Sequence, residues 1–389
     1  MSASNRVKVR MNFGNGTSIS DWISFSLRDT YTDPLQEMTF QAAPTPPNRE
    51  DYAEQLKKGR LVTIYVDEVN HGGFLITRVR TTISKGGGFV YDITCKTPLV
   101  TPYEGSVNPE LQISTQTDTP ITSIVDKALA PYGFTSIIGD EASNVSILTG
   151  RPIKGGRAKI VVDALKQAEA KAQEGETAYQ FVSRLLSRVG ACLRMASTGE
   201  LLITNPDYEQ QSSYALVQDP TQRVAGDYFA GDVVIEDTND GQFSECRCRG
   251  QRDEQAGSTQ TARPDATVKS TDLNAQRPAY SGEQAGYKPK IIRDKNSRDF
   301  NRCKSVAKMA LGLPAKDAFT ISGEVDGFKA TTGALWQVNT TVDVYIAAIG
   351  LSEKMWIQER TFTQDKGGGQ KTKLKLLPLN ALLLGDLPK

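Results

Sequence analysis

The chain has 389 residues, of which 38% are hydrophobic and 23% charged, and its formal net charge is +1. A single hydrophobic core seldom extends far beyond about 250 residues, so this length predicts several domains. The near-neutral charge argues against a protein that grips nucleic acid over a basic surface, and the apolar content argues against a disordered tail.

The chain shows no targeting or membrane segment. The N-terminus lacks an apolar signal core, and no stretch approaches the roughly 18 apolar residues of a membrane helix. Five scattered cysteines do not suggest a disulfide framework. We therefore expect synthesis in a cytoplasm, reduced thiols and no membrane insertion.

The first hundred residues predict short strands separated by turns. In "LVTIYVD", Val62, Ile64 and Val66 share one face, which is the period-2 pattern of a half-buried strand. Glycine and proline recur between such segments. Regular short strands of this kind predict a small antiparallel barrel or sandwich.

Residues 106–215 have a different pattern. Thr119 and Pro120 predict the start of a helix that ends near Gly133, and Thr177 with Gln180 predicts a capping box. The second helix carries apolar residues at helical spacing and is followed by a hairpin over residues 191–204. This segment is predicted to be an α+β module.

Strands return after residue 216, but residues 251–290 contain no Ile, Phe, Met or Trp before Ile291. We expect this stretch to bury little and to form a loop or arm. A helix follows, with Ser297 as its cap and with Phe300, Cys303, Ala307 and Ala310 facing inward. The remaining residues read as strands.

The fold class predicted from these patterns is mainly β with an α+β module, built on two similar small antiparallel β-barrels per chain. An inserted helix/hairpin domain and a helical/loop excursion complete it. The predicted parts are a first barrel over 1–105, an α+β domain over 106–215, a second barrel from 216–250 and 315–389, and a polar loop plus helix over 251–314 inserted in the second barrel.

Two hairpins repeat in the sequence with a constant offset of 281 residues. Ile76 then corresponds to Ile357, and Ile93 to Leu374, while the strands before them agree within one residue. Both hairpins have the same tip, formed by Lys85, Gly86, Gly87 and Gly88 in one and by Lys366, Gly367, Gly368 and Gly369 in the other. Glycine-rich hairpin tips are common, but register held over three strands favours duplication.

Two equivalent barrels per chain would let three chains offer six positions. Such a ring matches a three-fold partner on one side and a six-fold partner on the other. The repeat therefore points toward assembly and away from catalysis.

Candidate catalytic groups are few. His71 is the only histidine and lies in a predicted exposed turn, and Cys246 and Cys248 lack the further ligands of a metal set. Glu176 could be a general acid, although a carboxylate at a helix start more simply complements the helix dipole. "KGGGF" and "KGGGQ" lack the ending of a phosphate loop. No catalytic, cofactor-binding or metal residue is assigned.

Trp336 lies at the start of a predicted strand in "GALWQVN". A large aromatic side chain at this position is either barrel core or an interface anchor. The sequence leaves both alternatives open.

Three segments carry a resemblance to a known family: "GETAYQFVSRLLSRVGACLRMASTGELLITNPD", "GALWQVNTTVDVYI" and "EKMWIQERTFTQDKGGGQKTKLKLLP". The chain resembles the baseplate hub protein of contractile-tailed bacteriophages, a Mu-type tail protein related to the T4-type hub and to the hub part of type VI secretion spike proteins. The likeness runs in order through most of the chain. It is weakest over residues 106–170 and 251–290.

The resemblance implies a structural, non-catalytic virion protein of the tail baseplate, assembled in the host cytoplasm. It implies a homotrimer whose pseudo-six-fold ring adapts the hexameric tail tube protein to the central spike protein and contacts other baseplate wedge proteins. The ring would enclose the channel for tape-measure protein and for phage DNA as transient cargo. No lysozyme-like or needle domain is recognised after the hub, and no cofactor is implied.

Two alternatives of a different class remain. One is a tail-associated hydrolase of cell wall or polysaccharide that uses a carboxylate pair, since Asp and Glu total 45. The other is a carbohydrate-binding β protein, against which the presence of only three tryptophans argues.

Overall fold

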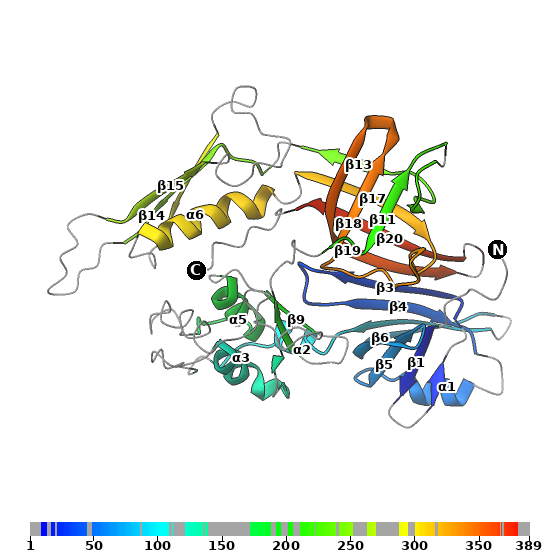
Figure 1. The fold of residues 1–389 in the computed structure, drawn as a ribbon. Helices are drawn as coiled ribbons and strands as arrows, with labels where there is room; N and C mark the ends of the chain where they lie inside the picture. Colours follow the sequence, from blue (N-terminus) through cyan, green and yellow to red (C-terminus); the bar gives the residue numbers. More distant parts are fainter. Residues whose placement is uncertain are drawn as a thin grey trace.

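The structure is a computed structural model that describes residues 9–13, 17–19, 22–44, 49–85, 88–108, 111, 121–134, 137–138, 172–187, 192–195, 201–204, 211–221, 223–238, 241–251, 263–269, 288–294, 300–315, 318–365, 367 and 369–379. Within these residues the chain is mainly β, as predicted. One sheet has 14 strands and two smaller sheets have three each (Figure 1). No helix in the described ranges is both long and apolar enough to cross a membrane.

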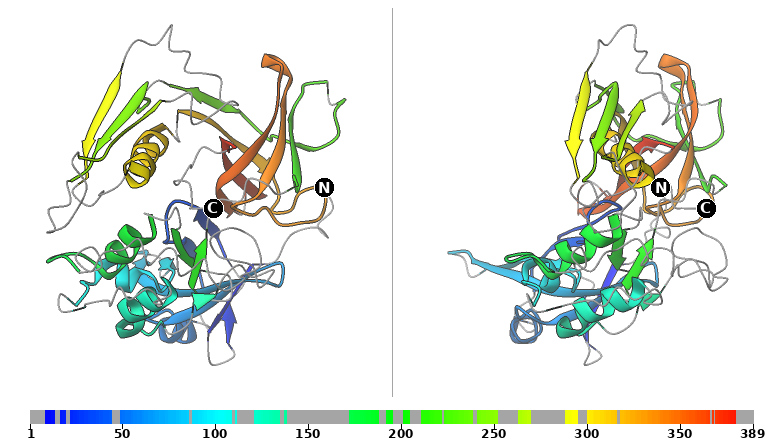
Figure 2. Two further views of the ribbon diagram at one scale, coloured as in Figure 1. Left: turned by 60° about the vertical axis from the view of Figure 1, so that its left-hand side comes forward. Right: turned by 90° about the vertical axis from the view of Figure 1, so that its left-hand side faces the viewer.

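Two groups of strands make up the large sheet. The first repeat consists of β1 (Val9–Phe13), β2 (Ser18–Ile19), β3 (Ser24–Thr30), β4 (Glu37–Ala42), β5 (Leu61–Val66), β6 (Val69–Ile83) and β7 (Phe89–Lys96), with helix α1 (Arg49–Gln55) before β5. The second repeat consists of β11 (Tyr214–Gln218), β12 (Asp227–Tyr228), β13 (Val234–Asp237), β17 (Phe319–Asp326), β18 (Thr341–Ile346), β19 (Leu351–Asp365) and β20 (Gly369–Pro378), with the 3-10 turn η5 (Ala347–Ile349) between β18 and β19. Figures 1 and 2 show the second repeat above the first.

The two repeats share one strand order. Neighbouring strands run β3-β4-β7-β6-β5-β1-β2 in the first and β13-β17-β20-β19-β18-β11-β12 in the second. Each hairpin strand β6 and β19 has 15 residues. A β-bulge interrupts β6–β7 at Thr77 and β19–β20 at Gln358, so each bulge directly follows the corresponding residue Ile76 or Ile357. Because a bulge marks one defined register, this agreement confirms that the hairpins are equivalent.

The repeats differ at one edge. β1 runs antiparallel to β5, whereas β11 runs parallel to β18. β12 follows β11 in a parallel pair, and the chain beyond it returns to β17 through an isolated bridge between Phe229 and Val325. The copies therefore match in the strands β3-β4-β7-β6-β5 and β13-β17-β20-β19-β18, and they differ at the last two strands of each repeat, β1-β2 and β11-β12.

The two repeats are fused through β19 and β3. β19 pairs with β18 and β20 of its own repeat and also, over Glu359–Asp365, with β3 of the first repeat. Buried side chains of both repeats form one hydrophobic cluster, which includes Phe25, Leu27, Phe328 and Phe362. Named strand pairs form no closed ring within the described ranges, so the observed architecture is one continuous sheet with a repeated half.

A separate core lies in the predicted α+β module. Its elements are α2 (Val100–Glu104), α3 (Ile121–Leu129), η3 (Ala130–Tyr132), β8 (Ile137–Ile138), α5 (Ala178–Ser187), β9 (Cys192–Met195) and β10 (Leu201–Thr204). The predicted capping box is confirmed: the Gln180 amide donates to Thr177 Oγ1 over 3.1 Å, and the Thr177 amide donates to Gln180 Oε1 over 3.0 Å. Gly133 adopts a φ of +84° after η3, where the helix was predicted to end. Thr119 and Pro120 lie outside the described residues.

A third core contradicts, for residues 265–269, the prediction that residues 251–290 bury little; residues 252–262 and 270–287 lie outside the described residues. β14 (Glu245–Arg249) pairs with β15 (Asp265–Lys269) and β16 (Pro289–Arg293), and helix α6 (Phe300–Ala315) packs on this sheet (Figure 1). Ala266 and Val268 are buried. They alternate with polar residues along β15, so both side chains point to the same face of the strand, as larger apolar residues would. Cys303 and Ala307 face inward as predicted, but Phe300 is 57% exposed. Ser297 lies outside the described residues.

Gly323 offers a test of the packing inside the second repeat. A Cβ at Gly323 would lie 2.5 Å from Cδ1 of Phe229, the residue that bridges back to β17. Gly323→Ala is expected to lower the free energy of unfolding by about 1–3 kcal/mol, since overpacking displaces the ring. Gly231→Ala is the control, because its Cβ would meet no atom within 4 Å. Denaturant unfolding that shows equal effects for both variants would contradict this packing.

Candidate functional site

The joint between the repeats is the most elaborate polar site among the described residues. Its basis is the antiparallel pairing of β3 with the distal half of β19. On the exposed side of the joint, Arg28 Nη2 lies 2.8 Å from Glu359 Oε2. A second ion pair joins Lys329 of the second repeat to Asp67 in the β5–β6 turn. Ion pairs therefore connect the two repeats both at the β3–β19 pairing and at the β5–β6 turn.

A largely buried ion cluster lies on the other side of the joint, in which Asp29 and Arg194 are each 13% exposed. Arg360 of β19 is 3% exposed, and its Nη2 lies 3.6 Å from Asp29 Oδ2 on β3. Arg194 of β9 donates from Nη2 to the other carboxylate oxygen of Asp29 over 2.8 Å. One carboxylate therefore serves two guanidinium groups, and it joins the second repeat, the first repeat and the α+β module.

Aromatic rings enclose these charges. The Arg360 guanidinium lies 4.1 Å from the centroid of the Phe362 ring, and that of Arg194 lies 5.0 Å from the Tyr31 ring. Tyr31 in turn meets Trp356 edge-on at 5.0 Å. Burial lowers the pKa of Arg360, and Asp29 opposes this shift. The cation is retained in the core because a carboxylate and a π-face compensate its desolvation.

Gln358 completes the joint at the bulge of β19. The backbone carbonyl oxygen of Gln358 accepts a hydrogen bond from the Tyr31 backbone amide over 2.8 Å, and the side-chain Nε2 donates to Thr32 Oγ1 over 3.2 Å. Gln358 is 4% exposed. The bulge thus turns this side chain toward the first repeat, which is the usual effect of a bulge on local side-chain direction.

His71 belongs to this joint, and its prediction as an exposed turn residue was wrong. The turn is formed by Asp67 and Glu68, which have positive φ, and His71 already lies within β6. Its ring meets Phe362 edge-on at 6.1 Å, and Nε2 is enclosed without a hydrogen-bond partner in the described part of the chain. Burial and the positive charge of Arg360 lower the pKa of His71 to about 3.

The neutral state of His71 predicts a pH effect on stability. The unfolded chain binds a proton at His71 below its ordinary pKa of 6.5, whereas the folded chain binds it only near 3. His71 therefore contributes a loss of stability as pH falls through this window. In His71→Phe, the free energy of unfolding should fall less steeply between pH 6.5 and 4 than in wild type. Parallel denaturant curves over this range would show that His71 titrates normally in the folded state.

Trp336 lies in the core of the second repeat. It is fully buried, and its ring lies 4.5 Å from that of Tyr214. Its carbonyl oxygen accepts a hydrogen bond from Arg360 Nη1 over 3.1 Å. Within one chain, Trp336 therefore helps to hold the Arg360 guanidinium of the ion cluster in place.

The Lys-Gly-Gly-Gly tips follow β6 and β19 in the sequence, and the second tip comes directly after Asp365, the last residue of β19 that pairs with β3. Lys85, Gly88 and Gly367 are exposed, and Gly369 adopts a φ of +77°. Ser84 Oγ accepts the Gly88 amide over 2.9 Å, and Asp365 Oδ1 accepts the Gly367 amide over 2.8 Å. The side chains at the equivalent positions 84 and 365 thus both bind a backbone amide of their own tip, although the amide lies four residues on in one and two residues on in the other. Gly86, Gly87, Lys366 and Gly368 lie outside the described residues.

Glu176 is held in an ion pair. Its carboxylate accepts hydrogen bonds from Arg184 Nε and Nη2 over 2.7 and 2.9 Å and from the Gln173 amide over 3.0 Å. Burial disfavours its charged form, but the hydrogen bonds outweigh burial and lower the pKa of Glu176. A carboxylate held in its ionised form is poorly suited to a general acid.

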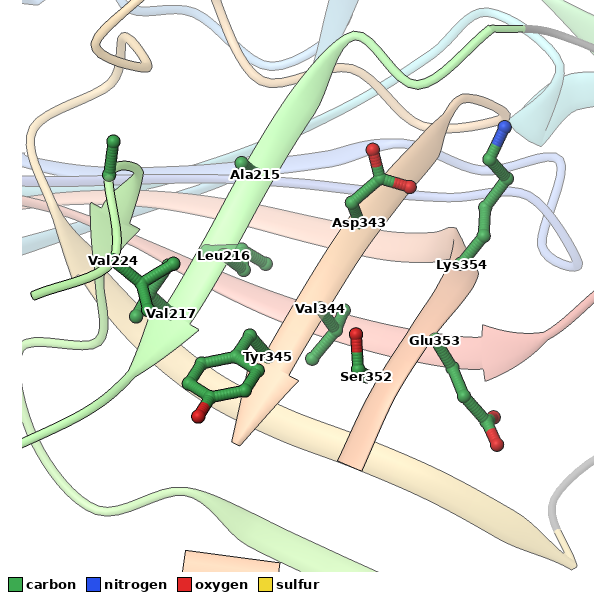
Figure 3. A pocket seen from close by; sticks show the side chains of 11 residues that line it. Ala215, Leu216, Val217, Val224, Asp343, Val344, Tyr345, Ser352, Glu353 and Lys354 are labelled. Atoms are coloured by element: carbon green, nitrogen blue, oxygen red, sulfur yellow. The ribbon is translucent and has the colours of Figure 1, made fainter. Parts of the chain in front are cut away.

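A shallow groove of about 250 Å³ crosses β11, β18 and β19 (Figure 3). Val217 and Val224 line its apolar side, while Asp343, Glu353 and Lys354 stand at its polar side. Both carboxylates are exposed. The general acid of a glycosidase pair needs apolar surroundings, whereas both carboxylates here face water, so the groove does not favour the hydrolase alternative.

Cys246 and Cys248, considered as metal ligands from the sequence, lie in a hydrophobic core. Cys246 and Cys248 are both fully buried in the core beneath α6. Burial raises the pKa of Cys248 to about 12. Thiols in this state pack as small apolar groups.

Comparison with known proteins places this fold. Residues 315–377 match the family model of the NMB1110-like tail protein, C-terminal domain. A tail protein from Neisseria meningitidis MC58 aligns with a TM-score of 0.72 at 16% identity, over 97% of this chain and 98% of that one. The 43 kDa tail protein of prophage MuSo2 from Shewanella oneidensis gives 0.72 at 16%, over 96% and 99%.

A more distant likeness is to a chain of the Francisella PdpA-VgrG complex. The TM-score is 0.54 at 11% identity, over 100% of this chain and 60% of that one. No curated protein matches the sequence. The resemblance to phage tail proteins that the sequence predicted is confirmed, and at these identities the solved structures show a shared fold.

Proposed function

We propose that this chain, which has a tail-protein fold, is the structural hub of a phage tail baseplate. Three copies form a ring in which the two repeats of each chain occupy six similar positions. One face of the ring meets a six-fold tail tube, and the other meets a three-fold spike. Wedge proteins attach outside it, and the ring encloses the channel for tape-measure protein and DNA.

The observation that carries this proposal is the duplication of the sheet. Both repeats have the same strand order and carry a bulge at the same position of the central hairpin. An enzyme gains nothing evident from such duplication, whereas a ring of three chains gains six similar surfaces. The role we propose is accordingly non-enzymatic, with no cofactor.

Each repeat is proposed to act as a barrel-like unit. The return of Phe229 to β17 supports this for the second repeat, since the Ala230 amide also donates to the Glu324 carbonyl oxygen over 2.7 Å. In the first repeat, Trp22 Nε1 donates to the Val9 carbonyl oxygen over 3.0 Å and links β1 to the chain before β3. The domain bounds 1–105, 106–215, 216–250 with 315–389, and 251–314 are part of this proposal.

The Lys-Gly-Gly-Gly tips are proposed as equivalent contact points of the ring. The exposure of Lys85 and Gly367 supports this role. Trp336, in contrast, is proposed as an internal support of the second barrel rather than as an anchor in an interface.

Light scattering with negative-stain imaging tests the proposed function. Three copies of the 42.5-kDa chain give about 127 kDa, and the images should show a ring with a central opening. The concentration should be varied, since association follows mass action. A chain that stays monomeric up to its solubility limit, or that cleaves peptidoglycan or binds cell-surface polysaccharide as a monomer, would contradict the hub.

A further inference from the structure

The joint uses one edge of each repeat and leaves the equivalent edges open. β3 is the outer strand of the first repeat, and its counterpart β13 in the second repeat pairs only with β17. Residues 359–365 of β19 pair with β3, and their counterparts are residues 78–83 of β6 and the following Ser84. β5 reaches along β6 only to Leu75, so residues 78–83 pair with β7 alone. Within the described ranges, both counterpart edges lack a strand neighbour.

The register of the joint can be transferred to these open edges. In the first repeat, the ladder runs from Cys95 through Met38 to Leu27. Leu376 is the counterpart of Cys95, and the ladder from it leads in the same two steps to Ile235. Leu27 and Ile235 are therefore equivalent, which fixes the counterpart of every other residue in β3 and β13. β6 and β19 keep the register in which Ile76 corresponds to Ile357.

These two correspondences define six opposite pairs between a β6 edge and a β13 edge. They are Arg78 with Thr238, Val79 with Asp237, Arg80 with Glu236, Thr81 with Ile235, Thr82 with Val234, and Ile83 with Val233, each derived from the β3–β19 register.

The charges at the open edges are complementary, with their signs exchanged relative to the joint. Within the chain, Arg28 on β3 pairs with Glu359 on β19. Their counterparts are Glu236 on β13 and Arg78 on β6, both exposed. Arg80, also exposed, lies directly opposite Glu236 in the transferred register. Opposite charges facing across an antiparallel pair stabilise that register.

The same edges expose apolar side chains. Ile83 on β6 is 64% exposed and Val234 on β13 is 52% exposed. In the transferred register, Ile83 lies opposite Val233, which packs partly against the main core, and Val234 lies opposite Thr82. Long open edges with apolar residues are usually protected by a neighbouring strand.

We propose that residues 78–83 of β6 pair antiparallel with β13 of a second copy of this chain. The contact repeats, between chains, the β3–β19 contact that exists within each chain. Alternation of the two contacts joins the sheets head to tail, so that neither the β6 edge nor the β13 edge stays open when the ring closes. Closure with three copies rests on the function proposed above, whereas the edge pairing itself does not depend on the number of copies.

A cysteine cross-link tests the register. Thr82→Cys/Val234→Cys places two thiols directly opposite one another, where Cβ atoms are roughly 4.5–5.5 Å apart. Mild oxidation should give a covalent product of three chains, about 127 kDa from three copies of 42.5 kDa. Mixing the two single variants should give a covalent product of two chains and nothing larger, which shows that the bond joins different molecules.

Thr81→Cys/Val234→Cys is the matched control. Thr81 lies one residue away, so its side chain points to the opposite face of the sheet and should not cross-link. The wild-type chain controls for its own cysteines, of which Cys95, Cys246, Cys248 and Cys303 are buried.

A charge reversal provides a second readout without cysteines. Glu236→Arg should weaken association at least about tenfold, because three arginines then meet at one contact. Arg78→Glu/Arg80→Glu combined with Glu236→Arg should restore it. Circular dichroism of each variant confirms folding, since all three residues are exposed.

The outcomes separate the edge pairing from the hub. A ring of three chains that gives no Thr82–Val234 cross-link overturns the edge pairing and leaves the hub standing. A chain that is monomeric at every concentration and gives no cross-link overturns both. If Thr82→Cys cross-links only to a different tail protein in assembled particles, that protein covers the edge and the proposal is wrong.

Discussion

Asp29→Asn is expected to lower the free energy of unfolding by about 3–5 kcal/mol, among the largest effects of any single substitution in this chain. The carboxylate is the shared partner of Arg194 at 2.8 Å and Arg360 at 3.6 Å. Without its charge, two guanidinium groups remain close together in the core. Removing one partner of a buried ion cluster costs more than the cluster itself contributes, because the remaining charge stays desolvated.

A second substitution should relieve this loss. Val79 occupies the counterpart position of Arg360 in the first repeat, so an apolar residue is compatible with this place in the fold. Asp29→Asn/Arg360→Met is therefore expected to be more stable than Asp29→Asn alone. Chemical denaturation followed by circular dichroism measures both.

The exposed pair between Arg10 and Glu68 is the control for Asp29. Its separation is 2.9 Å, and its side chains are 38% and 69% exposed. Glu68→Gln should cost at most about 1 kcal/mol, because water screens such pairs. Equal losses for Asp29→Asn and Glu68→Gln would contradict the account of the joint.

Trp336→Ala is expected to cost about 3–5 kcal/mol, since it empties a fully buried aromatic site. It also removes the ring that packs on Tyr214 at 4.5 Å. Trp336→Phe should lose much less, because phenylalanine keeps most of the buried area. The indole Nε1 has no hydrogen-bond partner within the described residues, so its removal gives up no hydrogen bond there.

Trp22→Phe is the matched comparison for Trp336→Phe. Trp22 is also buried, but its Nε1 donates to the Val9 carbonyl oxygen over 3.0 Å. The loss of that bond should make Trp22→Phe the more destabilising of the two by about 0.5–1.5 kcal/mol. If Trp336→Ala unfolds like wild type but fails to associate, Trp336 is an interface anchor and its assignment to the core is wrong.

The sequence was informative where structure is local or repeated. The Thr177–Gln180 capping box needs only residues three apart, and it forms as predicted. The repeat was visible from Ile76 and Ile357, and the structure adds the shared bulge that follows each of them. The capping box is a local pattern and the repeat is a likeness between two segments, so both can be recognised without knowing which residues are neighbours in space.

The ion cluster at the joint was missed because its members are far apart in the chain. Asp29, Arg194 and Arg360 come from three different units. One signal was present: Arg360 shares a period-2 register with Phe362 on a strand whose counterpart carries Val79. An arginine in an apolar register predicts a buried partner, but the pattern does not say which carboxylate it is.

His71 and residues 265–269 were misjudged for related reasons. A glycine after His71 suggested a turn, yet the turn is made by Asp67 and Glu68 in left-handed backbone. β15 is short and has no large apolar residue, so composition understated the burial of Ala266 and Val268. In both cases the tertiary neighbours decide burial, and the local sequence does not contain them.

An electron cryo-microscopy reconstruction of the assembled chain tests the central claim most directly. The claim is that the two repeats occupy equivalent positions in a ring of three chains. We expect three-fold symmetry with six similar lobes, and one strand ladder that runs unbroken from residues 78–83 of one copy to β13 of the next. A ring in which the edges lie apart would contradict the edge pairing alone, whereas a ring in which only one repeat of each chain faces the channel would contradict the central claim.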